Sequence, residues 1–418
     1  MTLIQKKENS YNYILAPEKK SHIFLIALLF FSINPPLSII FLITRIIKQQ
    51  GKEEQSFFAL YTFLALYLGL IMSTKEPISD WLNYKIQFEL AESKNFIEYI
   101  IYFKKEPVFY IINFILYKIF VGSFTAYAVT IIFIGYFLFF ISIHKFWRYF
   151  SNNYSIILFS ILFFAFFNNH FSNSGHLTRQ VLAGSFFIFF FIEKIVNKRN
   201  RWLFVIMAVL IHSSSALLFI IIFIPSFVNK FSIKRFLVIF ISFLVFSALG
   251  GVVYSYFNNL TSSISWLNYG FQRIETIDSL KTTWYEGGGT FGNRVYYFFL
   301  LAIVIRVYVF KIVSSKEYYL FNVLIALVFL QEYYVISGLL FLQLRFMVYI
   351  FLFIPFVLPY IFNTNLKRNN TFIKIEIIQT VLVVASIVRF FLRRNSGEFQ
   401  YDSIIELLIN PPIIYFFQ

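Results

Sequence analysis

The chain has 418 residues, of which 59% are hydrophobic and only 13% charged, and 60 of them are Phe. A water-soluble protein of this length cannot hide so much apolar surface in one core, so an ordinary soluble domain is excluded. The net charge of +16 would suggest nucleic-acid binding in a soluble protein, but the sequence contains no nucleic-acid motif. We expect no nucleic-acid partner and attribute the basic excess to short cytoplasmic loops of a membrane protein.

Absent residue types narrow the chemistry further. The chain has no cysteine, which excludes disulfides, thiolate metal sites and a cysteine nucleophile. Its five histidines lack metal-ligand spacing such as HExxH, so we expect neither a metal nor another cofactor. The polar start of the chain is not followed by a small-residue cleavage site, and we expect no removable signal peptide.

Apolar runs close to the length of a membrane-spanning helix recur along the whole chain. They predict a single all-α domain over residues 1–418, a polytopic membrane bundle of roughly 11–13 transmembrane or re-entrant helices. The apolar tail 403–418 is short and interrupted by Pro411 and Pro412, which favours an interfacial or re-entrant segment. The expected runs are 22–46, 56–73, 108–122, 124–143, 154–173, 177–195, 202–227, 235–257, 295–313, 319–340, 346–363 and 371–392.

The short loops between these runs are rich in Lys and Arg, and such loops usually face the cytoplasm. The polar loops 74–107 and 258–294 then face outward. The runs 22–46 and 202–227 have basic clusters at both ends. They read as re-entrant hairpins, broken at "SINPPLS" and "IHSSSAL", unless one basic loop faces the wrong side.

Three arginines stand at the outer edge of expected spans, where an ionisable residue is costly and therefore a candidate for function. On the expected orientation Arg179, Arg294 and Arg345 each begin a helix at the outer face. Guanidinium groups beside positive helix ends offer paired hydrogen bonds to a diphosphate or another polyanion. The alternative is that each arginine reaches to the interface or binds lipid headgroups.

Asp80 and Glu106 are the outward-facing carboxylates nearest the membrane, and either could act as general base on a sugar hydroxyl. Their structural alternatives are a helix cap for Asp80 and stabilisation of a helix dipole for Glu106, which precedes Pro107. His212 lies inside an apolar run and could donate to a phosphate or a sugar. It could equally bond the serines that follow it or a backbone carbonyl.

Four segments carry a family resemblance through their order and spacing: "SDWLNYKIQF", "EPVFYIINFIL", "GHLTRQVLAG" and "VLIHSSSALLF". They contain an acidic D-x-x-x-Y segment, E-P-x-[FL], R-Q-x-[IL]-A at a helix start, and a helix with H-x-[ST]-[AS] after a basic loop. The series resembles the EpsG family of bacterial polysaccharide proteins, which overlaps with O-antigen polymerases of the Wzy type. The residues that carry it are Asp80 with Tyr84, Glu106 with Pro107, Arg179 with Gln180, and His212 with Ser214 and Ser215, while Arg345 lies in a segment like a later one of the family.

The resemblance implies a glycosyltransferase at the periplasmic face of the bacterial inner membrane, joining oligosaccharide repeat units linked to undecaprenyl diphosphate. The growing chain would leave its lipid diphosphate for a sugar hydroxyl of the incoming unit. Arginines would stabilise the leaving diphosphate, and a carboxylate would take the acceptor proton. Besides the lipid-linked oligosaccharide, membrane lipid and a chain-length regulator are implied partners. The resemblance places Arg179, Gln180, Arg345 and Tyr84 among the substrate contacts, and the positions of Arg294 at a helix start and of His176 just ahead of Arg179 add these two as candidates.

Two other functions stay open at this point. A flippase for the lipid-linked unit would also need cations for the diphosphate, but it should carry mid-membrane charges and often internal repeats. The chain has no visible repeat and its charges gather at one face, which favours the enzyme. A membrane glycosyltransferase using polyprenyl-phosphate sugars, or an acyltransferase, is separated from the polymerase only by the resemblance.

Overall fold

The computed structural model describes residues 22–103, 105–223, 241, 289–310, 315–336, 340–362, 372–394, 399 and 404–416. Over these residues the chain forms helices, and the one β feature is an isolated bridge between Lys75 and Phe399. The expected all-α membrane bundle is therefore confirmed for the described part of the chain. The expected run 235–257 and most of the loop 258–294 lie outside it.

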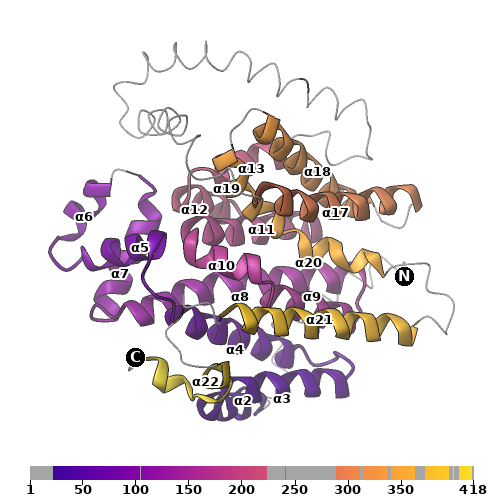
Figure 1. Cartoon of the computed structure of the whole chain (residues 1–418), viewed down its shortest axis with the longest axis horizontal. Helices are drawn as coiled ribbons and strands as arrows, with labels where there is room; N and C mark the ends of the chain where they lie inside the picture. The colour runs from indigo at the N-terminus through magenta and orange to yellow at the C-terminus, as the bar shows by residue number, and fades with distance from the viewer. Residues whose placement is uncertain are drawn as a thin grey trace.

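Four described helices are long and apolar enough to cross a membrane: α4 (Glu54–Ser73), α8 (Phe124–Phe150), α11 (Thr178–Asn197) and α21 (Phe372–Arg394). Helix α8 packs against α4 on one side and α11 on the other, and α4, α8 and α21 run lengthwise through the molecule (Figure 1). Gly69 permits the closest approach, because a Cβ atom there would lie 2.7 Å from the backbone oxygen of Val129. Most of α21 stays uncovered, as expected for a lipid-facing helix.

The expected run 154–173 is a bent pair, α9 (Tyr154–Ala165) and α10 (Asn168–His176), whose axes differ by 49°. The bend follows Ala165, where the apolar sequence gives way to "NNH". Helix α10 then leads directly into α11, so the polar stretch around Gly175 lies at one end of the bundle.

Three short helices gather at that same end (Figure 1, left): α5 (Ser79–Glu89), α6 (Phe96–Phe103) and α7 (Pro107–Ile119). The outward loop 74–107 is thus largely helical. The expected span 108–122 is wrong in length, because α7 has 13 residues and a span needs about 20. Helix α7 ends before Val121 and Gly122, whose positive φ values of 51° and 80° turn the chain towards α8.

The two runs with basic clusters at both ends, 22–46 and 202–227, are broken at the expected residues. The first is divided into α2 (Ile23–Ile33) and α3 (Pro35–Lys48), which pack together, and Asn34 between them accepts a hydrogen bond from the Leu37 amide at 3.1 Å. The second is divided into α12 (Trp202–Ile211) and α13 (Ser215–Ile222). That these runs enter and leave the membrane on one side stays a prediction.

The remaining described elements complete the bundle around these helices. Short apolar helices between residues 340 and 361 pack against α9, α10 and α11, and the C-terminal segment lies against α2, α3 and α4. The elements are α17 (Gly289–Phe310), α18 (Ser315–Ile336), α19 (Leu340–Phe351), α20 (Ile354–Val357), η3 (Leu358–Ile361), α22 (Ile404–Ile409) and η5 (Pro412–Phe416).

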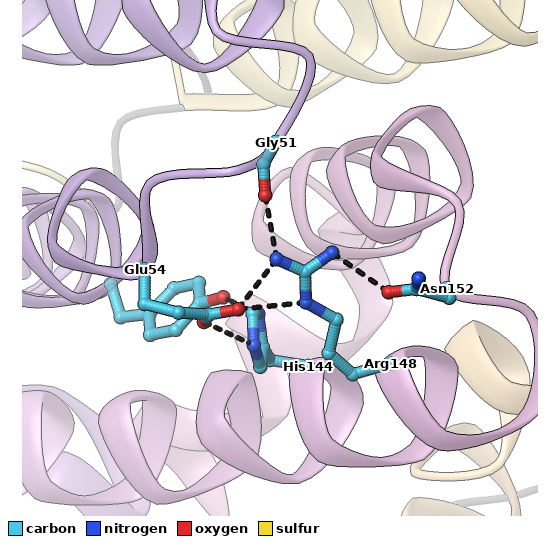
Figure 2. Close-up of polar contacts among 6 residues, drawn as sticks. Gly51, Glu54, His144, Arg148 and Asn152 are labelled. Atoms are coloured by element: carbon cyan, nitrogen blue, oxygen red, sulfur yellow. Dashed lines mark hydrogen bonds and ion pairs between the residues drawn. The ribbon is translucent and has the colours of Figure 1, made fainter. Parts of the chain in front are cut away.

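The opposite end of α4 and α8 carries a polar clamp (Figure 2). Glu54 accepts from the Nε and Nη2 atoms of Arg148 at 2.8 and 2.5 Å, and its other oxygen lies 2.9 Å from Nε2 of His144. Arg148 also donates to the Gly51 carbonyl at 2.6 Å and to Asn152 at 3.0 Å. The charged ends of two neighbouring spans are thereby tied together at the end expected to face the cytoplasm.

Candidate active site

A cavity of about 110 Å³ opens where α5 meets the start of α11. Its walls come from α5, α11, α19 and the break between α12 and α13. Segments more than 250 residues apart in sequence therefore meet here. Six of the nine side chains singled out from the sequence line this cavity: Asp80, Tyr84, Arg179, Gln180, His212 and Arg345.

Glu106 lies directly behind this wall and joins two of the lining residues. Its Oε2 atom accepts a hydrogen bond from Nη1 of Arg179, and its Oε1 atom lies 2.6 Å from Nδ1 of His212. The three side chains are only 8%, 14% and 13% exposed, respectively. One buried carboxylate thus fixes a cation from α11 and an imidazole from the α12–α13 break.

The backbone of Glu106 is set for this contact. It stands before Pro107 in the left-handed region, with φ at 48° and ψ at 54°, a conformation that is unfavourable for a residue with a side chain. Although it occupies the N-cap position of α7, its side chain accepts no capping hydrogen bond. The dipole role considered from the sequence is therefore not the one observed, because the carboxylate turns to Arg179 and His212.

The charge state of Glu106 follows from these neighbours. Burial alone would raise the pKa of its carboxyl group, but the hydrogen bond with His212 and the charges of Arg179 and Lys105 lower the pKa to about 2. Glu106 is therefore a permanent carboxylate near neutral pH and a weak base. This argues that it holds its two partners in place and that another group takes a substrate proton.

Arg179 is held by aromatic as well as charged groups. Its guanidinium carbon lies 5.7 Å from the ring centre of Tyr84 and 5.6 Å from that of Phe109, within the range of cation–π attraction. Nη1 also donates to the Tyr110 hydroxyl at 3.3 Å. Its Nε atom has no hydrogen-bond partner among the described residues. The arrangement fixes the guanidinium in the cavity wall while part of its donor capacity stays unused.

Gln180 and Arg345 connect α11 to α19. Nε2 of the buried Gln180 donates to the backbone oxygen of Arg345 at 2.5 Å. One turn along, Gly184 lets the helices approach, because a Cβ atom there would lie 2.6 Å from Cδ1 of Leu352. This contact sets the position of the second arginine relative to the first.

His212 reaches the cavity because its helix stops. Helix α12 ends at Ile211 and the His212 backbone is extended, with φ at −151° and ψ at 113°. Its Nδ1 atom faces Glu106 rather than the serines considered from the sequence, and Ser214 bonds the Tyr349 hydroxyl at 2.9 Å. Nε2 has no hydrogen-bond partner in the described part of the chain, and the imidazole lines the cavity.

Two expectations about the arginines need correction. Of the three, Arg179 alone lies in the first turn of its helix, since α17 begins at Gly289 and α19 at Leu340, each five residues before its arginine. The residues of "LFLQL" favour a helix, whereas "GTFGN" is helical in spite of its two glycines, and both helices therefore begin upstream. The Arg294 side chain lies outside the described ones.

The outcomes for His176 and for the capping role considered for Asp80 differ from what was expected. His176 ends α10, two residues before α11, and is not among the cavity-lining residues. Asp80 lies in the first turn of α5 but is not its N-cap, which is Ile78, so the capping alternative is wrong. Asp80 instead lines the cavity, and it is the one carboxylate among the described lining residues.

Four lining residues were missed, the polar Asn83, Gln87 and Lys105 and the apolar Leu177. The first two lie three and seven residues after Asp80, a spacing that places them on one face of a helix with Tyr84. That periodicity is present in the sequence but lay in a segment interpreted as a loop. Among the described residues, no group of three His, Asp or Glu side chains is placed to hold a metal ion.

Comparison with known proteins agrees with this arrangement. The model of the EpsG family matches residues 58–403, a range that contains every residue of the cavity. No curated protein and no solved structure matches the chain significantly. EpsG-like proteins are Wzy-type polymerases, glycosyltransferase-like membrane proteins. The chain thus belongs to the EpsG family of multi-pass membrane proteins, with a polymerase-type role in polysaccharide biosynthesis.

Proposed function

We propose that the protein joins oligosaccharide repeat units linked to undecaprenyl diphosphate, building O-antigen or a similar surface polysaccharide at the periplasmic face of the bacterial inner membrane. One observation carries the proposal: a cationic cavity at the expected outer end contains an imidazole oriented by a buried carboxylate. Diphosphate binding and proton removal, the two tasks of such a transfer, thereby meet in one place.

The charge of the cavity suits a diphosphate. Among the described residues, Arg179, Arg345 and Lys105 line it, against the carboxylate of Asp80. Fixed cations stabilise the negative charge that develops on a leaving group without having to reorganise. At about 110 Å³ the cavity can take phosphate groups but is well below the size of sites that enclose larger ligands. The sugars and the lipid tail would therefore extend out of it.

His212 is the proposed base. With its Nδ1–H donated to Glu106, the Nε2 lone pair is left to accept the proton of the acceptor hydroxyl. The acceptor oxygen forms the new bond to the anomeric carbon as the bond from that carbon to the diphosphate oxygen breaks. The departing diphosphate keeps the electron pair and is stabilised by the arginines. Asp80 accepts hydrogen bonds from sugar hydroxyls beside it.

Purified protein in lipid nanodiscs, supplied with lipid-linked repeat units from a strain lacking the gene, tests this proposal. We expect lipid-linked dimers and longer chains, with one undecaprenyl diphosphate released for each bond formed. Arg179→Ala should reduce the rate about 100- to 1000-fold at normal protein level. Arg389→Ala is the matched control, because Arg389 lies on α21 and does not line the cavity.

A cellular experiment separates the enzyme from a flippase. Cells lacking the protein should attach single repeat units to the lipid A core and show no ladder. Loss of all surface units, with lipid-linked units trapped inside, would instead favour transport and contradict the proposal.

A further inference from the structure

A second cavity, of about 200 Å³, lies on another side of α5. Its polar lining includes Lys75 and Lys85 and the hydroxyl groups of Thr125 and Tyr415, and no carboxylate is found among the described residues that line it. The lysines come from the α4–α5 connection and from α5 itself. Like the first cavity, it therefore presents cationic groups at the expected outer end, with lysines in place of arginines.

Lys75 is unusually deep for a lysine, with only 4% of its surface exposed. Its stem passes beside Gly175, where a Cβ atom would lie 3.1 Å from Cδ of Lys75 and 2.9 Å from Sδ of Met72. Its Nζ atom lies 5.5 Å from the ring centre of Phe399. The lysine is thus held by packing along its whole length, as a preformed binding group is.

The start of α8 adds to the positive potential. Phe124 and Thr125, the first two residues of this 27-residue helix, both line the second cavity. The first-turn amides of a long helix carry partial positive charge and favour a nearby anion. Together with the two lysines, this makes the cavity suited to a phosphate group.

Helix α5 separates the two cavities. Asp80, Asn83, Tyr84 and Gln87 line the first cavity, while Lys85 lines the second. Residues spaced by three, four and seven share one helix face, and Lys85 projects from another. The two cavities are therefore about one helix diameter apart, roughly 10–12 Å.

We propose that the lysine cavity is a second phosphate site, which holds the diphosphate of the incoming acceptor unit while the arginine cavity holds that of the donor. The inference rests on the proposed function, because a transfer between two lipid-diphosphate-linked substrates requires two diphosphates to be bound at once. The separation across α5 keeps the like-charged groups apart and leaves the attached sugars free to meet.

Native mass spectrometry of the full-length protein in phosphatidylcholine nanodiscs, titrated with undecaprenyl diphosphate, counts the sites. We expect two bound molecules for wild type, one for Arg179→Ala and one for Lys75→Gln/Lys85→Gln. Combining the three changes should leave none. A single site in wild type, lost with Arg179→Ala, would overturn the second site and leave the proposed function intact. Wild type that binds two molecules but forms no glycosidic bond would instead overturn the proposed function.

Lys85→Gln alone guards against misfolding, because the Lys85 side chain is 38% exposed. This substitution should weaken the binding of one of the two undecaprenyl diphosphate molecules about tenfold or more. It should also raise the KM for the acceptor and leave the KM for the donor unchanged. Lys118→Gln on α7, which lines neither cavity, should change nothing. Unchanged acceptor KM in Lys85→Gln would overturn the proposal.

The source of the phosphate is tested by adding phosphatidylglycerol. If undecaprenyl diphosphate still occupies the second site at excess phosphatidylglycerol, the substrate assignment stands. Phosphatidylglycerol could instead displace undecaprenyl diphosphate from the second site, and Lys75→Gln/Lys85→Gln could bind phosphatidylglycerol as weakly as it binds undecaprenyl diphosphate. In that case the cavity is a site for membrane lipid headgroups, and the proposal is overturned.

Discussion

At each end of the bundle a glutamate contacts one arginine and one histidine, yet the two clusters differ in what they leave open. The outer cluster is Glu106 with Arg179 and His212, and the inner one is Glu54 with Arg148 and His144 (Figure 2). Residue type and pairing are the same, so neither distinguishes a site from a clamp.

The inner cluster is closed on itself. Arg148 donates to Glu54, to the Gly51 carbonyl and to Asn152, so all three of its nitrogens are engaged. Both ring nitrogens of His144 are used, one facing Glu54 and the other the Tyr61 hydroxyl. Four of the five N–H donors of Arg148 and both ring nitrogens of His144 are thus engaged within the cluster, which ties α4 to α8.

The outer cluster is open on one side. Nε2 of His212 has no partner among the described residues, and both His212 and Arg179 line a cavity. Unused hydrogen-bonding capacity that faces a cavity, rather than residue identity, therefore distinguishes the outer cluster as the candidate active site.

The largest contrast is expected between the two histidines. His212→Asn removes the proposed base and should reduce polymerisation about 100- to 10,000-fold. His144→Asn should leave the rate per folded molecule within about twofold, because it touches no cavity group. Initial rates in nanodiscs, normalised to folded protein, measure both. Equal losses in the two variants would contradict the assignment.

The difference in stability between wild type and Glu106→Gln should depend on pH. The pKa of Glu106 is lowered from 4.5 to about 2, so its stabilising contribution is complete above pH 4.5 and is lost as pH falls towards 2. A shift of this size corresponds to about 3 kcal/mol. The unfolding temperatures of wild type and Glu106→Gln should therefore differ constantly from neutral pH down to about pH 5 and converge below about pH 4. If the two unfolding temperatures already converge between neutral pH and pH 5, a group other than Glu106 causes the pH dependence.

The inner clamp should affect stability and not catalysis. Arg148→Ala removes hydrogen bonds to a charged group and should lower the free energy of unfolding by about 1.5–3 kcal/mol. Turnover per folded molecule should stay near that of wild type. Thermal unfolding in detergent, with rates measured at the same folded concentration, tests both statements. A loss of turnover per folded molecule would contradict this prediction, because it would show that the inner cluster takes part in the reaction.

The smallest effect concerns the spacing of the two arginines. Gly184→Ala places a methyl group against the mobile end of Leu352, so the cost in stability should be about 1 kcal/mol. Leu352 directly follows α19, which carries Arg345, so we expect the displaced side chain to cause a small loss of rate. Gly135→Ala is the control, since its Cβ atom would meet Ser185 at an ordinary 3.6 Å. A loss of rate as large in the control would assign the effect to general packing.

The architecture was largely predictable because apolar run length reports directly on membrane crossing. The breaks in the runs 22–46 and 202–227 could be predicted from proline and clustered serine. The span at 108–122 was wrong because the apolar run continues through Val121, where the backbone turns. The outward loop 74–107 was not recognised as helical although Trp81, Tyr84 and Phe88 have helical spacing, because its helices are short and separated by polar residues.

The residues that line the cavity were predicted better than the contacts among them. Family motifs pointed to the six predicted lining residues. No local pattern, however, indicates that Glu106 pairs with both Arg179 and His212, since the partners lie 73 and 106 residues away. Helix starts before Arg294 and Arg345 were missed because no cap or proline marks them.

Those separations also bear on how the protein is made. As the chain is synthesised, Glu106 appears long before Arg179 and His212, and closing these contacts orders loops of 73 and 106 residues. Until α11 and α12 have been inserted, the carboxylate has neither partner, and a buried charge in that state costs several kcal/mol. The active site is therefore assembled late, and a chain that stops before His212 carries an unstable outer end that quality-control proteases can attack.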